Sequence, residues 1–84
     1  SGWVLDRGSW YYLTPGTGQM ATGWVKDGSH WYYLNPANGK MKTGWHYEDG
    51  SWYYLKPGSG QMATGRLWIV WKYYRFADNG KLIR

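Results

Sequence analysis

The chain has 84 residues, a size typical of one small domain. It has no cysteine, which excludes disulfide bonds and cysteine-based metal sites. Its aromatic residues, 21% of the total, are eight Trp and nine Tyr against one Phe, and rings with polar tips suit half-exposed positions better than a sealed core. The net charge of +5 comes from scattered Lys and Arg, a pattern that favours solubility or a polyanionic partner over nucleic acid. No apolar run approaches the roughly 20 residues that span a bilayer.

A repeat of 20 to 21 residues organises the chain. In three units a Gly-Trp pair, a Trp-Tyr-Tyr-Leu motif, a proline, a Met and a Thr-Gly pair follow one another at constant spacing. The repeats cover about residues 1–22, 23–43, 44–64 and 65–84, which we interpret as a single repeat domain over 1–84. Because the chain starts abruptly within a repeat and shows no signal peptide, we expect a mature fragment, a cut-out domain or an engineered piece.

Each unit predicts a β-hairpin followed by a connecting turn. Residues 24–26 and 30–34 are rich in strand-favouring types, and Asp27-Gly28 between them is a strong hairpin signal. A two-residue loop at that pair would set Trp24 opposite Trp31. In the first and third units the Gly comes one place later, as in a type I turn followed by a bulge. Nothing has a helical period, so the sequence predicts an all-β solenoid of stacked hairpins.

Strand alternation divides the rings of each motif between two faces. In the second unit Trp31 and Tyr33 share one face, while Tyr32 and Leu34 share the other. One face has to pack against neighbouring hairpins, because an isolated hairpin is only marginally stable in water. We expect the first Tyr of each motif, at positions 11, 32 and 53, to lie in the core.

The fourth unit departs from the pattern. Arg66 stands in place of the Trp of the Gly-Trp pair, Leu82 replaces the Met, and Tyr73-Tyr74 follows the preceding Tyr-Tyr pair by 20 residues instead of 21. Residues 66–76 also include a dense apolar run. Terminal repeats commonly diverge because they cap a stack, so we interpret this unit as a cap. The alternative is a structural or engineered β-repeat whose divergent C-terminal unit mediates self-association, giving a homodimer.

The succession of Gly-Trp, Gly-x-Trp-Tyr-Tyr-Leu and Gly-x-Met-x-Thr-Gly closely resembles the choline-binding repeats of pneumococcal surface proteins and phage lysins. The resemblance is strong over residues 2–65 and holds only in outline beyond them. It implies choline sites between consecutive hairpins, each made of the Trp of Gly-Trp, the Trp of Trp-Tyr-Tyr, a Tyr of the next repeat and a nearby Met. Carried onto this chain, these are Trp3, Trp10 and Tyr33 with Met20; Trp24, Trp31 and Tyr54 with Met41; and Trp45, Trp52 and Tyr74 with Met62.

The residue chemistry supports this interpretation independently. A quaternary ammonium group cannot donate hydrogen bonds, whereas aromatic faces attract it by about 0.5–2 kcal/mol per ring, with Trp the best ring. The resemblance implies a module that anchors a protein to choline or phosphocholine of teichoic and lipoteichoic acids at a bacterial cell surface. A core-only role for the rings and a glucan-binding module are the remaining alternatives.

The sequence offers no catalytic constellation. His30 and His46 fall at different places in their repeats without a third ligand in register, and the carboxylates cluster in the hairpin turns, where Asp is common for backbone reasons. We therefore expect no enzyme activity, no metal, no cofactor besides the ligand choline, no nucleic-acid partner and no membrane span.

Overall fold

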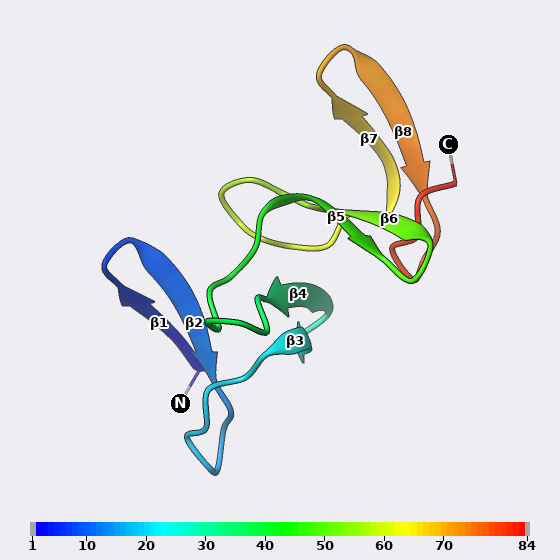
Figure 1. Cartoon of the computed structure of the whole chain (residues 1–84). Coiled ribbons are helices and arrows are strands. Elements are labelled where there is room, and N and C mark those ends of the chain that lie inside the picture. Colours follow the sequence, from blue (N-terminus) through cyan, green and yellow to red (C-terminus); the bar gives the residue numbers. More distant parts are fainter. Residues whose placement is uncertain (1, 84) are drawn as a thin grey trace. The chain divides into compact units, whose positions relative to one another are not determined.

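The computed structural model describes residues 2–83, within which every regular element is a β-strand (Figure 1). The strands are β1 (Gly2–Asp6), β2 (Ser9–Leu13), β3 (Gly23–Asp27), β4 (His30–Leu34), β5 (Gly44–Glu48), β6 (Ser51–Leu55), β7 (Gly65–Ile69) and β8 (Lys72–Phe76). Each consecutive pair forms an antiparallel two-stranded sheet, so the chain is a series of four hairpins. This confirms the predicted all-β class. No helix that could cross a membrane occurs in residues 2–83.

The hairpins are grouped in two compact units, Ser1–Lys42 and Thr43–Arg84. The first unit contains the hairpins β1–β2 and β3–β4, and the second contains β5–β6 and β7–β8. A connecting turn follows each hairpin and returns to it through an isolated bridge, such as Leu34 with Met41 or Phe76 with Leu82. The backbone N–H of Met41 donates to the carbonyl of Trp10, and that of Leu82 donates to the carbonyl of Trp52, both over 2.8 Å. In each unit the second connecting turn is thereby tied to the first hairpin.

All four hairpins close with two-residue loops. In the first, Asp6 pairs with Ser9, and the loop residues Arg7 and Gly8 have φ values of 51° and 81°. Positive φ at both positions is the mark of a type I′ turn, whose twist matches that of the flanking strands. The bulged turns expected for the first and third hairpins are therefore wrong. The third hairpin closes in the same way at Asp49-Gly50.

In the second hairpin the loop is Gly28-Ser29, one residue later than expected. Asp27 pairs with His30, and only Gly28 of the loop has positive φ, as in a type II′ turn. The register then places Trp24 opposite Tyr33, not opposite Trp31, which pairs with Lys26. Because these two pairs are two positions apart along the ladder, Trp24 and Trp31 still share a face.

The fourth hairpin keeps the 21-residue period, although its Tyr-Tyr pair follows the preceding one by 20 residues. Gly65 pairs with Phe76 just as Gly44 pairs with Leu55, so each position of β7–β8 follows its counterpart in β5–β6 by 21 residues. Tyr74 is therefore the structural counterpart of Tyr53, and Tyr73 that of Trp52. The missing residue lies in the connecting turn, where Leu82 follows Met62 by 20 residues.

Each unit has a small core of its own. In the second unit Ala63, Ile69 and Phe76 are buried, and Trp45, Tyr54, Leu67, Tyr74 and Leu82 pack around them. In the first unit Tyr12 and Tyr33 are each only 8% exposed, and Leu34 is fully buried. The most buried Tyr is thus the second of the motif, and the expectation that the first would occupy the core is wrong. The second Tyr lies directly opposite the Trp of Gly-Trp and is covered by it.

The tip of the fourth hairpin is strained. Val70 and Trp71 form its loop with φ values of 41° and 68°, although neither is glycine, and they are 80% and 86% exposed. Left-handed backbone costs a residue with a side chain about 1–2 kcal/mol. We expect W71G to raise the free energy of unfolding by about 1 kcal/mol, measured by urea titration. The reverse change G8A, where φ is 81° and nothing surrounds an added Cβ, should lower it by a similar amount; a stabilising G8A would contradict the account.

In the connecting turn at Gly39 a Met side chain packs directly against a glycine. A Cβ on Gly39 would lie 2.5 Å from the sulfur of Met20, whereas its counterpart Gly18 has open space around it. The two glycines have nearly the same φ, 78° and 74°. We expect G18A to cost about 1 kcal/mol of stability through backbone strain, and G39A to cost up to about 1 kcal/mol more, because the half-exposed Met20 side chain has to move aside. Equal losses in urea titrations would show that the contact with Met20 is unimportant.

Candidate functional site

The first unit holds a Trp between two Tyr rings. Trp3 of β1 packs edge-on against Tyr12 of β2 with ring centroids 5.0 Å apart, and against Tyr32 of β4 with centroids 4.8 Å apart. The indole Nε1–H of Trp3 also donates to the Asp27 carboxylate at the end of β3, over 2.9 Å. These contacts join the first hairpin to the second and fix the Trp3 ring on the face that also carries Trp10, the partner of Leu5 in the ladder.

The Tyr that reaches Trp3 comes one position before the expected one. Tyr33 packs instead against Trp24 of its own hairpin, with centroids 5.0 Å apart. The register explains this difference, because Tyr33 lies directly opposite Trp24 and shares its face. Tyr32, opposite Val25, points to the other face, which is turned to the preceding hairpin.

The Met residues are also displaced from their expected places. Met41, through its backbone bond to Trp10, lies at the first site, and Met20 instead packs beside Gly39 in the next connecting turn. In the second unit Leu82 occupies the place that corresponds to Met41, while Met62 packs beside Gly80. The residue that completes each site thus belongs to the repeat after the two Trp, as the Tyr does.

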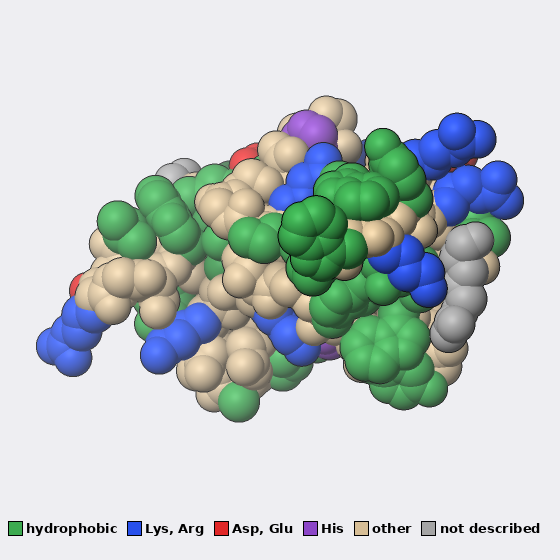
Figure 2. Space-filling view, turned by 90° about the horizontal axis from the view of Figure 1, so that it is seen from above, with side chains coloured by type: hydrophobic (Ala, Val, Ile, Leu, Met, Phe, Trp, Pro, Cys, Tyr) green, Lys and Arg blue, Asp and Glu red, His purple; other side chains and the backbone are tan. Residues whose placement is uncertain are grey.

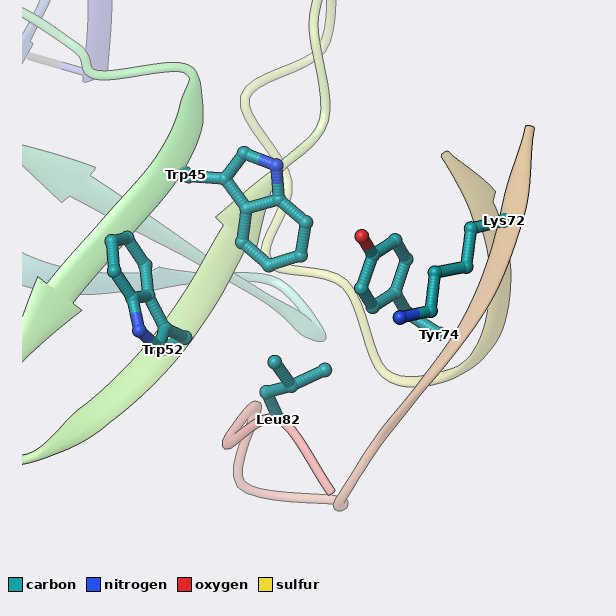
Figure 3. Close-up of a pocket in the computed structure, with 5 residues that line it drawn as sticks. All are labelled: Trp45, Trp52, Lys72, Tyr74 and Leu82. Carbon is teal, nitrogen blue, oxygen red and sulfur yellow. The ribbon is translucent and has the colours of Figure 1, made fainter. Parts of the chain in front are cut away.

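The second unit contains a cavity of about 370 Å³ lined by Trp45, Trp52, Lys72, Tyr74 and Leu82 (Figure 3). Trp45 stands nearly perpendicular to Trp52, at an interplanar angle of 88° and a centroid distance of 6.1 Å. Tyr74 of the next hairpin packs against Trp45 at 5.0 Å. The structure thus brings together the three rings that the sequence grouped here, Trp45, Trp52 and Tyr74.

Sequence reasoning missed Lys72 at this cavity. Its Nζ lies 5.3 Å from the centroid of the Tyr74 ring, within the range of a cation–π contact. Figure 3 shows the side chain running along the ring from β8. Lys72 pairs with Ile69 next to the loop, and this pairing is what places its side chain beside Tyr74. The sequence alone could indicate it only if the register of the divergent fourth hairpin were known.

The second Trp of each site remains open to solvent. Trp10, Trp31 and Trp52, at the same position of three hairpins, are 40%, 39% and 41% exposed. On the face seen in Figure 2, hydrophobic side chains reach the surface between Lys and Arg side chains. An exposed ring beside a fixed, half-buried one forms a hollow whose walls are aromatic faces, and such walls bind cations that carry no hydrogen-bond donor.

The residues of the middle group lie in different units. Trp24 and Trp31 belong to the first, where Trp24 packs on Tyr33; Tyr54 belongs to the second, where it packs on Trp45 at 5.0 Å. Their grouping with Met41 stays a prediction.

Titratable groups have structural partners near the turns. His46 Nε2 and Glu48 Oε1 are 3.2 Å apart, and His46 is buried. Burial, followed by the charges of Glu48 and Asp49, raises the pKa of Tyr53. No group of three His, Cys, Asp or Glu able to hold a metal ion is found in the part of the chain that the structure describes.

Comparisons with known proteins agree with this geometry. Residues 21–67 match the family model of the choline-binding repeat, and residues 1–20 match that of a cell wall binding repeat. The chain belongs to the choline-binding repeat family. None of the curated protein sequences compared with it matches.

Several solved structures of choline-binding repeats are similar to the chain. The choline binding domain of Spr1274 from Streptococcus pneumoniae is 42% identical, with a TM-score of 0.83 over 100% of this chain and 95% of that one. Choline binding protein F of Streptococcus pneumoniae is 44% identical with a TM-score of 0.93, over 98% of this chain and 27% of that protein. The Cpl-1 endolysin of phage Cp-1, solved with choline, is 40% identical with a TM-score of 0.59, over 95% and 23%. The chain therefore spans about a quarter of the longer relatives.

The bond between Trp3 and Asp27 offers a test of how the first site is held. A hydrogen bond to a carboxylate contributes about 1.5–3 kcal/mol, and less where water competes. We expect D27N to lower the free energy of unfolding by about 1 kcal/mol and to change the near-ultraviolet circular dichroism of the Trp rings. D6N, at the same position of the first hairpin, is the matched control. An equal effect of both variants would mean that the bond to Trp3 contributes nothing.

Proposed function

We propose that this chain is a non-catalytic module that binds choline in aromatic cages and thereby anchors its protein to choline-bearing teichoic acids of a bacterial cell wall. The observation that carries the proposal is the cavity lined by Trp45, Trp52, Tyr74 and Leu82, in which Trp45 lies 6.1 Å from Trp52 and 5.0 Å from Tyr74 between ring centroids. The corresponding group in the first unit is Trp3, Trp10 and Tyr32 with Met41.

The chemistry of the walls selects the ligand. A trimethylammonium group is cationic, bulky and without N–H donors, so it gains from ring faces what it cannot gain from hydrogen bonds. Three rings at about 0.5–2 kcal/mol each support a dissociation constant near the millimolar range, about −4 kcal/mol. Firm attachment then requires several sites on one polymer.

The solved structures of relatives support a role in binding to the bacterial cell wall. The Cpl-1 structure contains choline, and one structure of choline binding protein F was determined with a peptidoglycan analogue. We infer that the present chain acts at the bacterial cell surface and that any catalytic activity resides in other domains of the proteins that carry such repeats. Within this chain the carboxylates of Asp27 and Glu48 already have structural partners, Trp3 and His46.

Replacement of one exposed cage ring tests the proposal. Choline binding is measured by equilibrium dialysis and by the upward shift of the unfolding midpoint, with ammonium chloride at equal ionic strength as the ligand control. We expect W52A to lower the number of bound choline molecules by one, because Trp52 is 41% exposed and its loss leaves the core intact.

The matched control variant is W68A. Trp68 is 52% exposed and packs only against Tyr73 among the ring contacts of the described chain, at 4.6 Å, so its removal should leave choline binding unchanged. A W52A chain that binds as much choline as the unaltered protein, or a response to ammonium equal to that to choline, would overturn the cage assignment.

A further inference from the structure

One face of the fourth hairpin carries two arginines and two aromatic rings. Arg66 lies directly opposite Arg75, and Trp68 lies directly opposite Tyr73. Directly opposed residues of an antiparallel pair share a face and have Cβ atoms about 4.5–5.5 Å apart. All four side chains are exposed, and Trp68 and Tyr73 pack edge-on at 4.6 Å. The two guanidinium groups are therefore held side by side at the base of the hairpin.

The two arginines lack internal compensation. Like charges directly opposite each other destabilise a strand pair. Residues 65–76 contain no Asp or Glu, and Lys72 adds a third positive charge. Within residues 2–83 neither arginine forms a salt bridge with a carboxylate. A pair that costs stability and has no counter-ion in the chain is arranged to receive an anion from outside.

The arginines stand where the first and third hairpins carry a packed Trp–Tyr pair. Arg66 occupies the position of Trp45, and Arg75 that of Tyr54, two rings that pack at 5.0 Å in the third hairpin. The same positions hold Trp3 and Tyr12 in the first hairpin. Two guanidinium groups in this place invert the preference of the surface, from a cation to an anion.

A hollow of about 300 Å³ lies at this pair, lined by Arg66, Tyr73, Tyr74 and Arg75. Tyr74 also lines the cavity of Trp45 and Trp52, so its ring is shared by both hollows of the second unit. Arg guanidinium matches the oxygens of a phosphate with two parallel N–H donors, and a Tyr hydroxyl can add another donor.

We propose that Arg66 and Arg75, with Tyr73, form a binding site for a phosphate ester beside the choline cage. The choice of phosphate among anions rests on the proposed function, because choline-bearing wall polymers carry phosphate; the binding of an anion rests on the arginine pair alone. A second copy of the chain is a poorer occupant, because two such hairpins would bring six positive charges together.

The test uses the whole chain and glycerol 3-phosphate as the probe, titrated at low ionic strength and followed by calorimetry. R66Q/R75Q removes both guanidinium groups and the charge-assisted hydrogen bonds that they can make, so we expect affinity to fall by about tenfold or more. Choline binding at Trp45 and Trp52 should persist. The control R7Q/K40Q lowers the net charge equally at two exposed positions of the first unit and should leave phosphate binding almost unchanged.

Each outcome of these titrations either supports or overturns the proposed phosphate site. A loss in R66Q/R75Q but not in R7Q/K40Q, with circular dichroism unchanged, supports the site. Equal losses would reduce the effect to net charge, and sulfate binding as tightly as the ester would remove the phosphate assignment. Binding that appears only together with dimerisation in sedimentation would overturn a site within one chain. If choline fails to bind while glycerol 3-phosphate still depends on both arginines, the proposed function fails and the anion site stands.

Discussion

The structure depends on a Trp that opens a hairpin and is clamped between two Tyr rings, one from its own hairpin and one from the next. Trp3 has Tyr12 and Tyr32 at 5.0 and 4.8 Å, and Trp45 has Tyr54 and Tyr74 at 5.0 Å each. A two-stranded hairpin buries too little to persist alone in water. This clamp is where consecutive hairpins obtain their shared apolar surface, in a chain with few aliphatic residues.

The clamp also explains why a binding site costs the fold little. The ring that stabilises the stack is held rigidly by its neighbours, so its remaining surface is already oriented for a ligand before one arrives. Trp52 needs only to stand beside Trp45, and because it is 41% exposed it contributes more to the site than to the core. Stability and recognition therefore use different parts of the same cluster, and preorganisation lowers the entropy that binding would otherwise cost.

The sequence predicted the hairpins, the period and the residue types of the cage, because all of these follow from local pattern. It failed where an answer depended on register. A loop at Gly28-Ser29, one residue later than expected, changes the partner of Trp24 from Trp31 to Tyr33. Tyr32 lies on the face opposite to Trp24 and Tyr33, and it is the ring that reaches Trp3. Tyr74 lies on Trp45 because Tyr73-Tyr74 is shifted by one along an unshifted hairpin. Lys72 could be found only after that register was known, since no other repeat has Lys or Arg at this position.

The fourth hairpin shows which constraints the repeat obeys. The face turned to the third hairpin keeps its apolar character, with Ile69 and Phe76 buried and Tyr74 on Trp45, because a change there would remove the surface that the clamp needs. The other face carries Arg66 and Arg75 where the third hairpin has Trp45 and Tyr54, and it shows no apolar restriction of this kind. Alternation along the strands thus lets the fourth hairpin keep one apolar face for packing while its other face carries different residue types.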